Sequence, residues 1–92
     1  MLFVAQLEPK GDSPPAERIA RRAEWQYPEG VNVLAEYWLQ TDGYSVITVM
    51  ETDSNDPIFA ITAQWGDVFN IKVSPAITGE HGLKMAAQMM QE

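Results

Sequence analysis

Two glutamates stand in a stretch that otherwise reads as a β-hairpin, and their chemistry is suited to moving a proton. Residues 35 to 53 read AEYWLQTDGYSVITVMETD and include Glu36 and Glu51, although glutamate is disfavoured in strands. Two neighbouring carboxyls shielded from water titrate as a coupled pair, and one of them then holds a proton near neutral pH. We therefore take Glu36 and Glu51 as candidate catalytic residues. In the alternative interpretation, both point into water at the edge of the sheet.

Aromatic side chains and one arginine are the candidate ligand-binding residues. The chain has three tryptophans and three tyrosines, and aromatic-lined pockets suit planar organic ligands. A guanidinium group on a helix can bind an anionic group. The candidates are Trp38, Tyr37, Trp25 and Arg22. The alternative is that the aromatics fill the core and that the arginines are paired with nearby glutamates on a solvated face.

Metal ligands and nucleophiles are scarce in this sequence. There is no cysteine and one histidine, His81. The absence of cysteine excludes thiolate metal sites and cysteine nucleophiles paired with histidine. A single histidine excludes, within one chain, metal sites built on several histidines. His81 stands in TGEHG, where we expect an exposed residue in the first turn of a helix rather than a haem ligand. We predict no metal and no cofactor.

The charge balance narrows the range of partners. Six Lys and Arg stand against thirteen Asp and Glu, a formal charge of -7, and 46% of the residues are hydrophobic. Such a surface repels nucleic-acid phosphates and anionic membranes. The initial stretch MLFVAQLEPKG has no basic region, and its apolar run stops at Glu8, so we expect neither a signal peptide nor a membrane span. We expect one globular domain over residues 1–92 in the cytoplasm.

The spacing of apolar residues predicts the elements that would position these side chains. Residues 2–7 are almost all apolar, as in a central strand that is buried on both faces. Ser13 and Pro14 predict the start of a helix that ends near Gln26. A hairpin then begins at Val31.

The second half of the chain repeats these signals. Asp56 and Pro57 predict a second helix, which Gly66 closes. Residues 69–73 alternate as an edge strand, and Thr78 caps a final helix with several methionines. The order β-α-β-β-α-β-α predicts an α+β, ferredoxin-like sandwich with an antiparallel sheet and an extra C-terminal helix. The first and third strands should be central.

The pair Asp42-Gly43 sets the predicted register of the hairpin, because it favours a two-residue type I′ turn. Tyr37 then pairs with Thr48 under the helices. The uncovered face carries Leu34, Glu36, Trp38, Ile47, Val49 and Glu51. There the two glutamates are diagonal neighbours, about 7 Å apart. An exposed apolar stripe of this kind predicts a homodimer whose sheets face one another.

The element order resembles the dimeric α+β barrel superfamily, and within it a small uncharacterised family of domains of unknown function. The residues that carry the resemblance are Trp38, Asp42-Gly43, Glu51-Thr52-Asp53, Trp65-Gly66-Asp67, Phe69, Val73 and Pro75. The resemblance implies that sheets from two subunits close a barrel. Relatives include cofactor-free monooxygenases, lactone isomerases, haem enzymes and proteins without known chemistry, so the fold alone does not choose a reaction.

Three functions are compatible with these observations. The first is a homodimeric domain that binds a small organic molecule. The second is a cofactor-independent oxidoreductase or isomerase acting on a small planar organic substrate, with Glu36 or Glu51 moving the proton. The third is a structural assembly subunit without a pocket, against which a cavity above about 300 Å³ beside Trp38 would count. Whether the protein is an enzyme stays open at this point.

Overall fold

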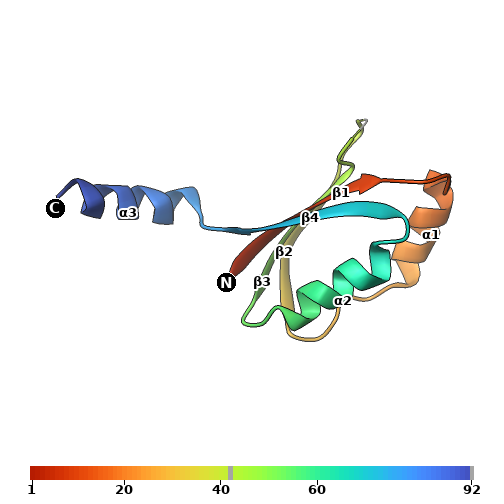
Figure 1. Ribbon diagram of the computed structural model, residues 1–92, viewed down its shortest axis with the longest axis horizontal. Coiled ribbons are helices and arrows are strands. Elements are labelled where there is room, and N and C mark those ends of the chain that lie inside the picture. Colours follow the sequence, from red (N-terminus) through yellow and green to blue (C-terminus); the bar gives the residue numbers. More distant parts are fainter. Residues whose placement is uncertain (42, 92) are drawn as a thin grey trace.

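Four strands form one antiparallel sheet, and three helices alternate with them in the predicted order (Figure 1). The computed structural model describes residues 1–41 and 43–91. The elements are β1 (Leu2–Pro9), α1 (Pro15–Glu24), β2 (Val31–Trp38), β3 (Val46–Thr52), α2 (Asp56–Trp65), β4 (Phe69–Ala76) and α3 (Gly79–Met90). The strand order is β2-β3-β1-β4. The fold is therefore the predicted ferredoxin-like α+β sheet, with β1 and β3 at its centre.

The helices begin close to where the sequence predicts. Pro14 precedes α1 in an extended conformation, and α1 starts one residue later at Pro15. Ser13 does not cap α1; its carbonyl and hydroxyl oxygens instead accept hydrogen bonds from Arg18. The side chain of Thr78 caps α3 as predicted, by accepting a hydrogen bond from the backbone N–H of His81 at 3.0 Å. No helix in the described part of the chain is long and apolar enough to cross a membrane.

The core lies between the sheet and α2. Its buried members are Ala5, Leu7, Met50, Ile61, Trp65 and Phe69. Side chains on one face of β1 are buried, whereas those on the other face, such as Val4 and Gln6, are only partly buried. The prediction that β1 is buried on both faces is therefore wrong for a single chain, because none of the described helices packs on the second face of the sheet.

The register of the hairpin differs from the prediction. Tyr37 pairs with Ile47 and Glu36 pairs with Thr48, and the pairing shifts again between Val33 and Ala35. A hydrogen bond of 2.7 Å from Leu39 N to Ser45 O closes the connection. This closure leaves an odd number of residues between the two strands, whereas a two-residue turn needs an even number. Gly43 has a φ of 85°, and the other half of the predicted turn, Asp42, lies outside the described residues.

A shift of one residue moves every side chain of a strand to the opposite face of the sheet. Glu36 and Trp38 therefore lie on the face that packs against α2, here called the helix face, in rows with Ala5 and Thr48 and with Leu7 and Val46. The opposite face, here called the open face, has an apolar centre that consists of Val4, Ala35, Tyr37, Ile47 and Val49. Glu51 lies on the open face, in a row with Leu2 and Asn32.

Two helices contribute no buried residue. These are α1 and α3. In Figure 1 they lie toward opposite ends of the molecule, which measures 53 Å along its longest axis, and α3 runs away from the sheet. The helix face beside α1 is consequently not filled by side chains of that helix, and a cleft lies there.

Candidate functional site

The cleft lies on the helix face and has a volume of about 690 Å³. The buried lining residues from the sheet include Ala5, Thr48 and Met50, and the lining residues from α1 include Arg18, Ile19 and Arg22. All three tryptophans of the chain line the cleft: Trp25, Trp38 and Trp65. The cleft exists because α1 reaches over the sheet with long polar side chains and buries no apolar residue against it.

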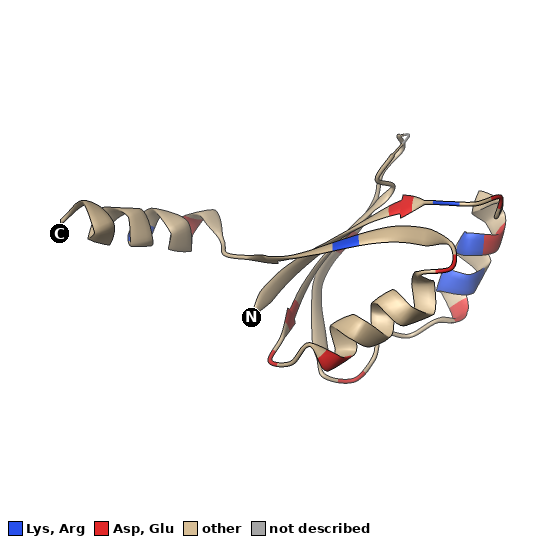
Figure 2. Cartoon of the chain, viewed as in Figure 1, with Lys and Arg blue, Asp and Glu red and all other residues tan. Residues whose placement is uncertain are grey.

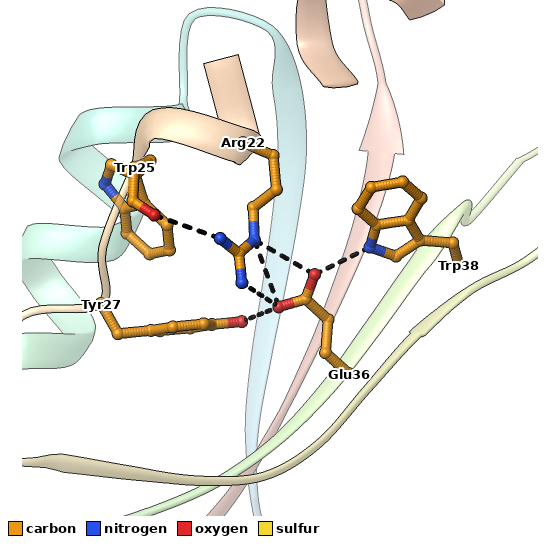
Figure 3. A network of polar contacts seen from close by, with 5 residues as sticks. All are labelled: Arg22, Trp25, Tyr27, Glu36 and Trp38. Atoms are coloured by element: carbon orange, nitrogen blue, oxygen red, sulfur yellow. Dashed lines mark hydrogen bonds and ion pairs between the residues drawn. The ribbon is translucent and has the colours of Figure 1, made fainter. Parts of the chain in front are cut away.

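The carboxylate of Glu36 is the centre of a hydrogen-bond network at the side of this cleft (Figure 3). Its Oε1 accepts hydrogen bonds from Arg22 Nη2 at 2.9 Å and from the Tyr27 hydroxyl at 2.5 Å. Its Oε2 accepts from Arg22 Nε at 3.1 Å and from Trp38 Nε1 at 2.7 Å. Arg22 Nη1 also donates to the carbonyl oxygen of Trp25 at 3.1 Å. Both carboxylate oxygens are thus fully engaged by donors.

Three elements bring these side chains together. Arg22 lies in the last turn of α1, and Tyr27 follows in the connection between α1 and β2. Glu36 and Trp38 are two residues apart on β2, so they project from the same face of the strand. The side chains of Glu36 and Arg22 are 16% and 32% exposed, respectively, so their ion pair is partly shielded from water.

The network determines the protonation states of its members. Burial raises the pKa of the Glu36 carboxyl, but the hydrogen bonds from Arg22, Tyr27 and Trp38 outweigh this effect, and the pKa lies below its ordinary value. Burial, and then the hydrogen bond to Glu36, raise the pKa of Tyr27 to about 12. The hydrogen bond to Glu36 likewise raises the pKa of Arg22. At neutral pH the site holds a carboxylate, a guanidinium cation and a neutral phenol.

These protonation states limit the chemistry of Glu36. An ionised carboxylate cannot act as a general acid, and one with a lowered pKa is a weak base. Its lone pairs are also occupied by four donor groups, as described above. The arrangement therefore makes Glu36 an anchor that orients Arg22, Tyr27 and Trp38 around the cleft.

A row of aromatic rings continues from this network into the core. Trp25 contacts Tyr27 with ring centroids 4.6 Å apart and Trp65 with centroids 5.6 Å apart, both edge to face. Trp65 in turn lies 5.8 Å from Phe69. The guanidinium of Arg22 lies 5.5 Å from the Trp25 ring and 5.2 Å from the Tyr27 ring. Such pairs favour defined ring orientations, so the rings on this side of the cleft support one another.

Comparison with known families gives one result. A family model described as a domain of unknown function, DUF3303, matches residues 1–90. The chain belongs to the DUF3303 family. No curated protein and no solved structure matches it. The predicted membership of an uncharacterised family is confirmed, and the function of this DUF3303 domain has to be argued from its site.

The structure brings together four of the six residues that the sequence predicts for the site. Arg22, Trp25, Glu36 and Trp38 all line the cleft. Tyr37, which is 61% exposed, and Glu51 lie on the open face instead. The prediction that Glu36 and Glu51 are neighbours is wrong, because the register of the DUF3303 hairpin places them on opposite faces of the sheet.

The sequence-based prediction of the site did not include Tyr27, a member of the network, or Thr48, a lining residue of the cleft. Tyr27 stands two residues after Trp25, and Thr48 is a polar residue in an apolar strand. At both positions a purely apolar side chain would pack equally well in the core. The polar hydroxyl group at each position is therefore the sequence signal that could have identified these residues. Both line the cleft, and their proximity to Glu36 can be recognised only once Glu36 is placed on the helix face.

The described part of the DUF3303 domain contains no group of three or more His, Cys, Asp and Glu residues arranged to hold a metal ion. His81 is exposed at the start of α3, as predicted, and its backbone N–H is engaged by the Thr78 cap. Figure 3 shows the polar groups that converge on Glu36: the guanidinium of Arg22, the phenol of Tyr27 and the indole N–H of Trp38.

Proposed function

We propose that this DUF3303 domain is a homodimeric binding module that takes a small planar organic molecule into the cleft of each chain. The observation that carries the proposal is the cleft itself: its volume of about 690 Å³ falls within the range of small-molecule sites, about 300 to 1,000 Å³. Aromatic and aliphatic side chains form most of its wall, and the network around Glu36 places several polar groups at one side. This combination is typical of ligand sites.

Binding is favoured over catalysis by the state of Glu36. A cofactor-independent oxidoreductase or isomerase needs a group that accepts or gives up a proton near neutral pH. Glu36 is ionised, has a lowered pKa and is saturated by donors. Tyr27, with a pKa of about 12, stays neutral. The cleft also argues against a structural subunit without a pocket.

The homodimer is supported by the open face. Its apolar centre lies on the two central strands and on β2, with no described helix packed on it. Exposed contiguous apolar surface of this kind marks an interaction site. A second copy is the occupant that we propose, because an apolar patch can pair with the same patch of a second chain across a two-fold axis. The cleft lies on the opposite face, so each chain would bind its own ligand.

The tryptophans provide a direct test of ligand binding. All three line the cleft, so an occupant changes the fluorescence of every tryptophan in the protein. We expect the neutral planar probe N-phenyl-1-naphthylamine to bind saturably at one site per chain. Energy transfer from tryptophan to the bound probe measures the affinity.

A variant locates the probe. Trp38→Ala should weaken binding about two- to tenfold, since aromatic contacts contribute roughly 0.5–1.5 kcal/mol. Phe59→Ala is the control, because Phe59 is 74% exposed on α2 and does not line the cleft. Binding that does not saturate, or that is the same in the Trp38 variant as in the wild type, would contradict the proposal.

A further inference from the structure

Arg18 differs from the other two arginines of α1 in its partners. Arg21 binds both carboxylate oxygens of Asp67 at 3.0 Å, and Arg22 binds Glu36. Arg18 Nη1 donates to the carbonyl oxygen of Ser13 at 2.5 Å and to its hydroxyl oxygen at 3.2 Å. Both of these acceptors are neutral. Among the described residues, no carboxylate lies within ion-pair distance of Arg18.

The position of Arg18 makes this difference relevant to the cleft. Arg18 and Arg22 line the cleft, whereas Arg21 does not. Figure 2 shows the basic bands that these arginines form on α1. The guanidinium of Arg18 lies 5.7 Å from the ring of Phe69, another lining residue, and its side chain is partly buried. The cleft therefore has, beside an aromatic ring, a cation with no anionic partner among residues 1–41 and 43–91.

Arg18 also has unused donors. A guanidinium group carries five N–H donors in a planar fork, and within the described residues Nε and Nη2 of Arg18 have no acceptor. This edge matches the two oxygens of a carboxylate, and such charge-assisted pairs are about twice as strong as neutral hydrogen bonds. An aromatic ligand with a carboxylate would satisfy both the rings and this edge.

The acidic residues of the cleft determine how a charged ligand would be oriented in it. Glu36 is occupied by Arg22. Glu8, the other acidic lining residue, lies by the hairpin end of the cleft, where its Oε2 is 3.9 Å from the place of a Cβ on Gly43. The cleft is thus cationic beside α1 and anionic beside the hairpin. A second anionic group on the ligand would be repelled at the hairpin end.

From these contacts we propose that the ligand is a planar aromatic molecule with a single carboxylate and that Arg18 binds this carboxylate. The inference rests on the proposed function, since it assigns the ligand class of the same cleft. It adds a specificity that the aromatic rings alone would not have: discrimination between an anionic molecule and a neutral one of the same shape.

Two probes with the same ring system test this discrimination. 1-Anilinonaphthalene-8-sulfonate carries one sulfonate, which stands in for the carboxylate, and N-phenyl-1-naphthylamine is its neutral counterpart. Arg18→Gln should weaken binding of the sulfonate about tenfold to hundredfold, the range for a hydrogen bond to a charged group. Binding of the neutral probe should change by less than about twofold, because the contribution of the rings is retained.

Control variants separate charge recognition from other effects. Lys84→Gln removes the same charge from α3, which does not line the cleft, and should alter neither affinity. Arg18→Lys keeps the charge without the planar fork and should show an intermediate loss for the sulfonate. Competition between the two probes in the wild-type protein verifies that they share one site.

The outcomes distinguish the two proposals. Saturable binding of the neutral probe with no effect of Arg18→Gln on the sulfonate would overturn the anion site and leave the binding function standing. An equal loss for both probes would also overturn it, because the variant would then disturb the cleft rather than remove an anion contact. If neither probe binds saturably to the wild-type protein, the binding function fails and the anion site fails with it.

Discussion

At the scale of single residues, Glu36 links Arg22, Tyr27 and Trp38 by accepting a hydrogen bond from each. Replacing it with glutamine keeps the shape but leaves the Arg22 cation without its carboxylate and weakens the hydrogen bonds from Tyr27 and Trp38. We expect Glu36→Gln to lower the free energy of unfolding at pH 7 by about 1–3 kcal/mol, the range for losing a hydrogen-bonded charge partner. Urea unfolding at fixed protein concentration measures this difference.

The effect of Glu36→Gln should depend on pH with a definite sign. The pKa of Glu36 is lower in the folded protein than its ordinary value of 4.5, so the ionised carboxylate stabilises the fold above that value. This stabilisation is lost as the pH falls through the folded pKa. The difference between wild type and variant should therefore be largest near neutral pH and shrink below pH 4.5. Glu51→Gln, on the exposed open face, is the control and should change little; equal stability of wild type and Glu36→Gln at pH 7 would contradict the role of Glu36.

At the scale of elements, α1 is attached through arginine side chains rather than through apolar packing. It buries no residue, whereas α2 buries Pro57, Ile61 and Trp65. Segments with few buried apolar contacts open at lower free energy than the core. We expect the backbone amides of α1 to exchange with deuterium faster than those of α2, as measured by mass spectrometry on the native protein.

One arginine should control this opening. Arg21 joins α1 to Asp67 and to the carbonyl oxygen of Gln64 at the end of α2. Arg21→Gln should therefore speed exchange in α1 and leave exchange in α2 unchanged. Protection of α1 equal to that of α2 in the wild-type protein would show that the helix is held by something other than these contacts.

The elements also show how far the sequence determines the site. Helix caps, apolar periodicity and the element order are local signals, and they predict the strand order, the cap at Thr78 and the edge position of β4. The register of β2 is not local. It depends on the closure between Leu39 and Ser45 and on the irregularity between Val33 and Ala35, whereas the pair Asp42-Gly43 suggests a two-residue turn.

An error of one residue in this register has a large consequence for the site. It interchanges the faces of Glu36 and Tyr37, so the predicted pair of glutamates does not exist and Tyr27 could not be recognised as a partner of Glu36. The positions of Arg22 and Trp25 do not depend on this register, and both residues line the cleft. The family is recognised from the sequence, but its description contains no function from which site residues could be assigned.

At the scale of the whole molecule, two apolar surfaces are not covered by any other described part of the chain. One is the open face. The other is α3, a helix of 12 residues with no buried residue, in which Leu83 and Met90 are 75% and 87% exposed. Isolated helices of this length are marginally stable in water, and small domains often gain stability from a second subunit. Both surfaces favour the proposed homodimer.

The proposed dimer predicts which substitutions separate the subunits. Val49 lies at the centre of the open face, in a row between Val4 and Ala35. A carboxylate there would be buried without a partner in the dimer, at a cost of several kcal/mol. We therefore expect the wild-type protein to have twice the chain mass of 10.3 kDa at micromolar concentration in light scattering, and Val49→Asp to have the mass of one chain.

Two control variants carry the same new charge at positions outside the open face. Trp38→Asp, which the sequence-based register places in the interface, should leave the dimer intact, because Trp38 lies on the helix face beside the cleft. Phe59→Asp adds the same charge at an exposed position on α2 and should also remain dimeric. Circular dichroism establishes that each variant is folded before its mass is compared. A monomeric wild-type protein would overturn the proposed dimer. A folded Val49→Asp variant that stays dimeric would show that the open face is not the interface, and α3 would then be the surface through which two copies associate.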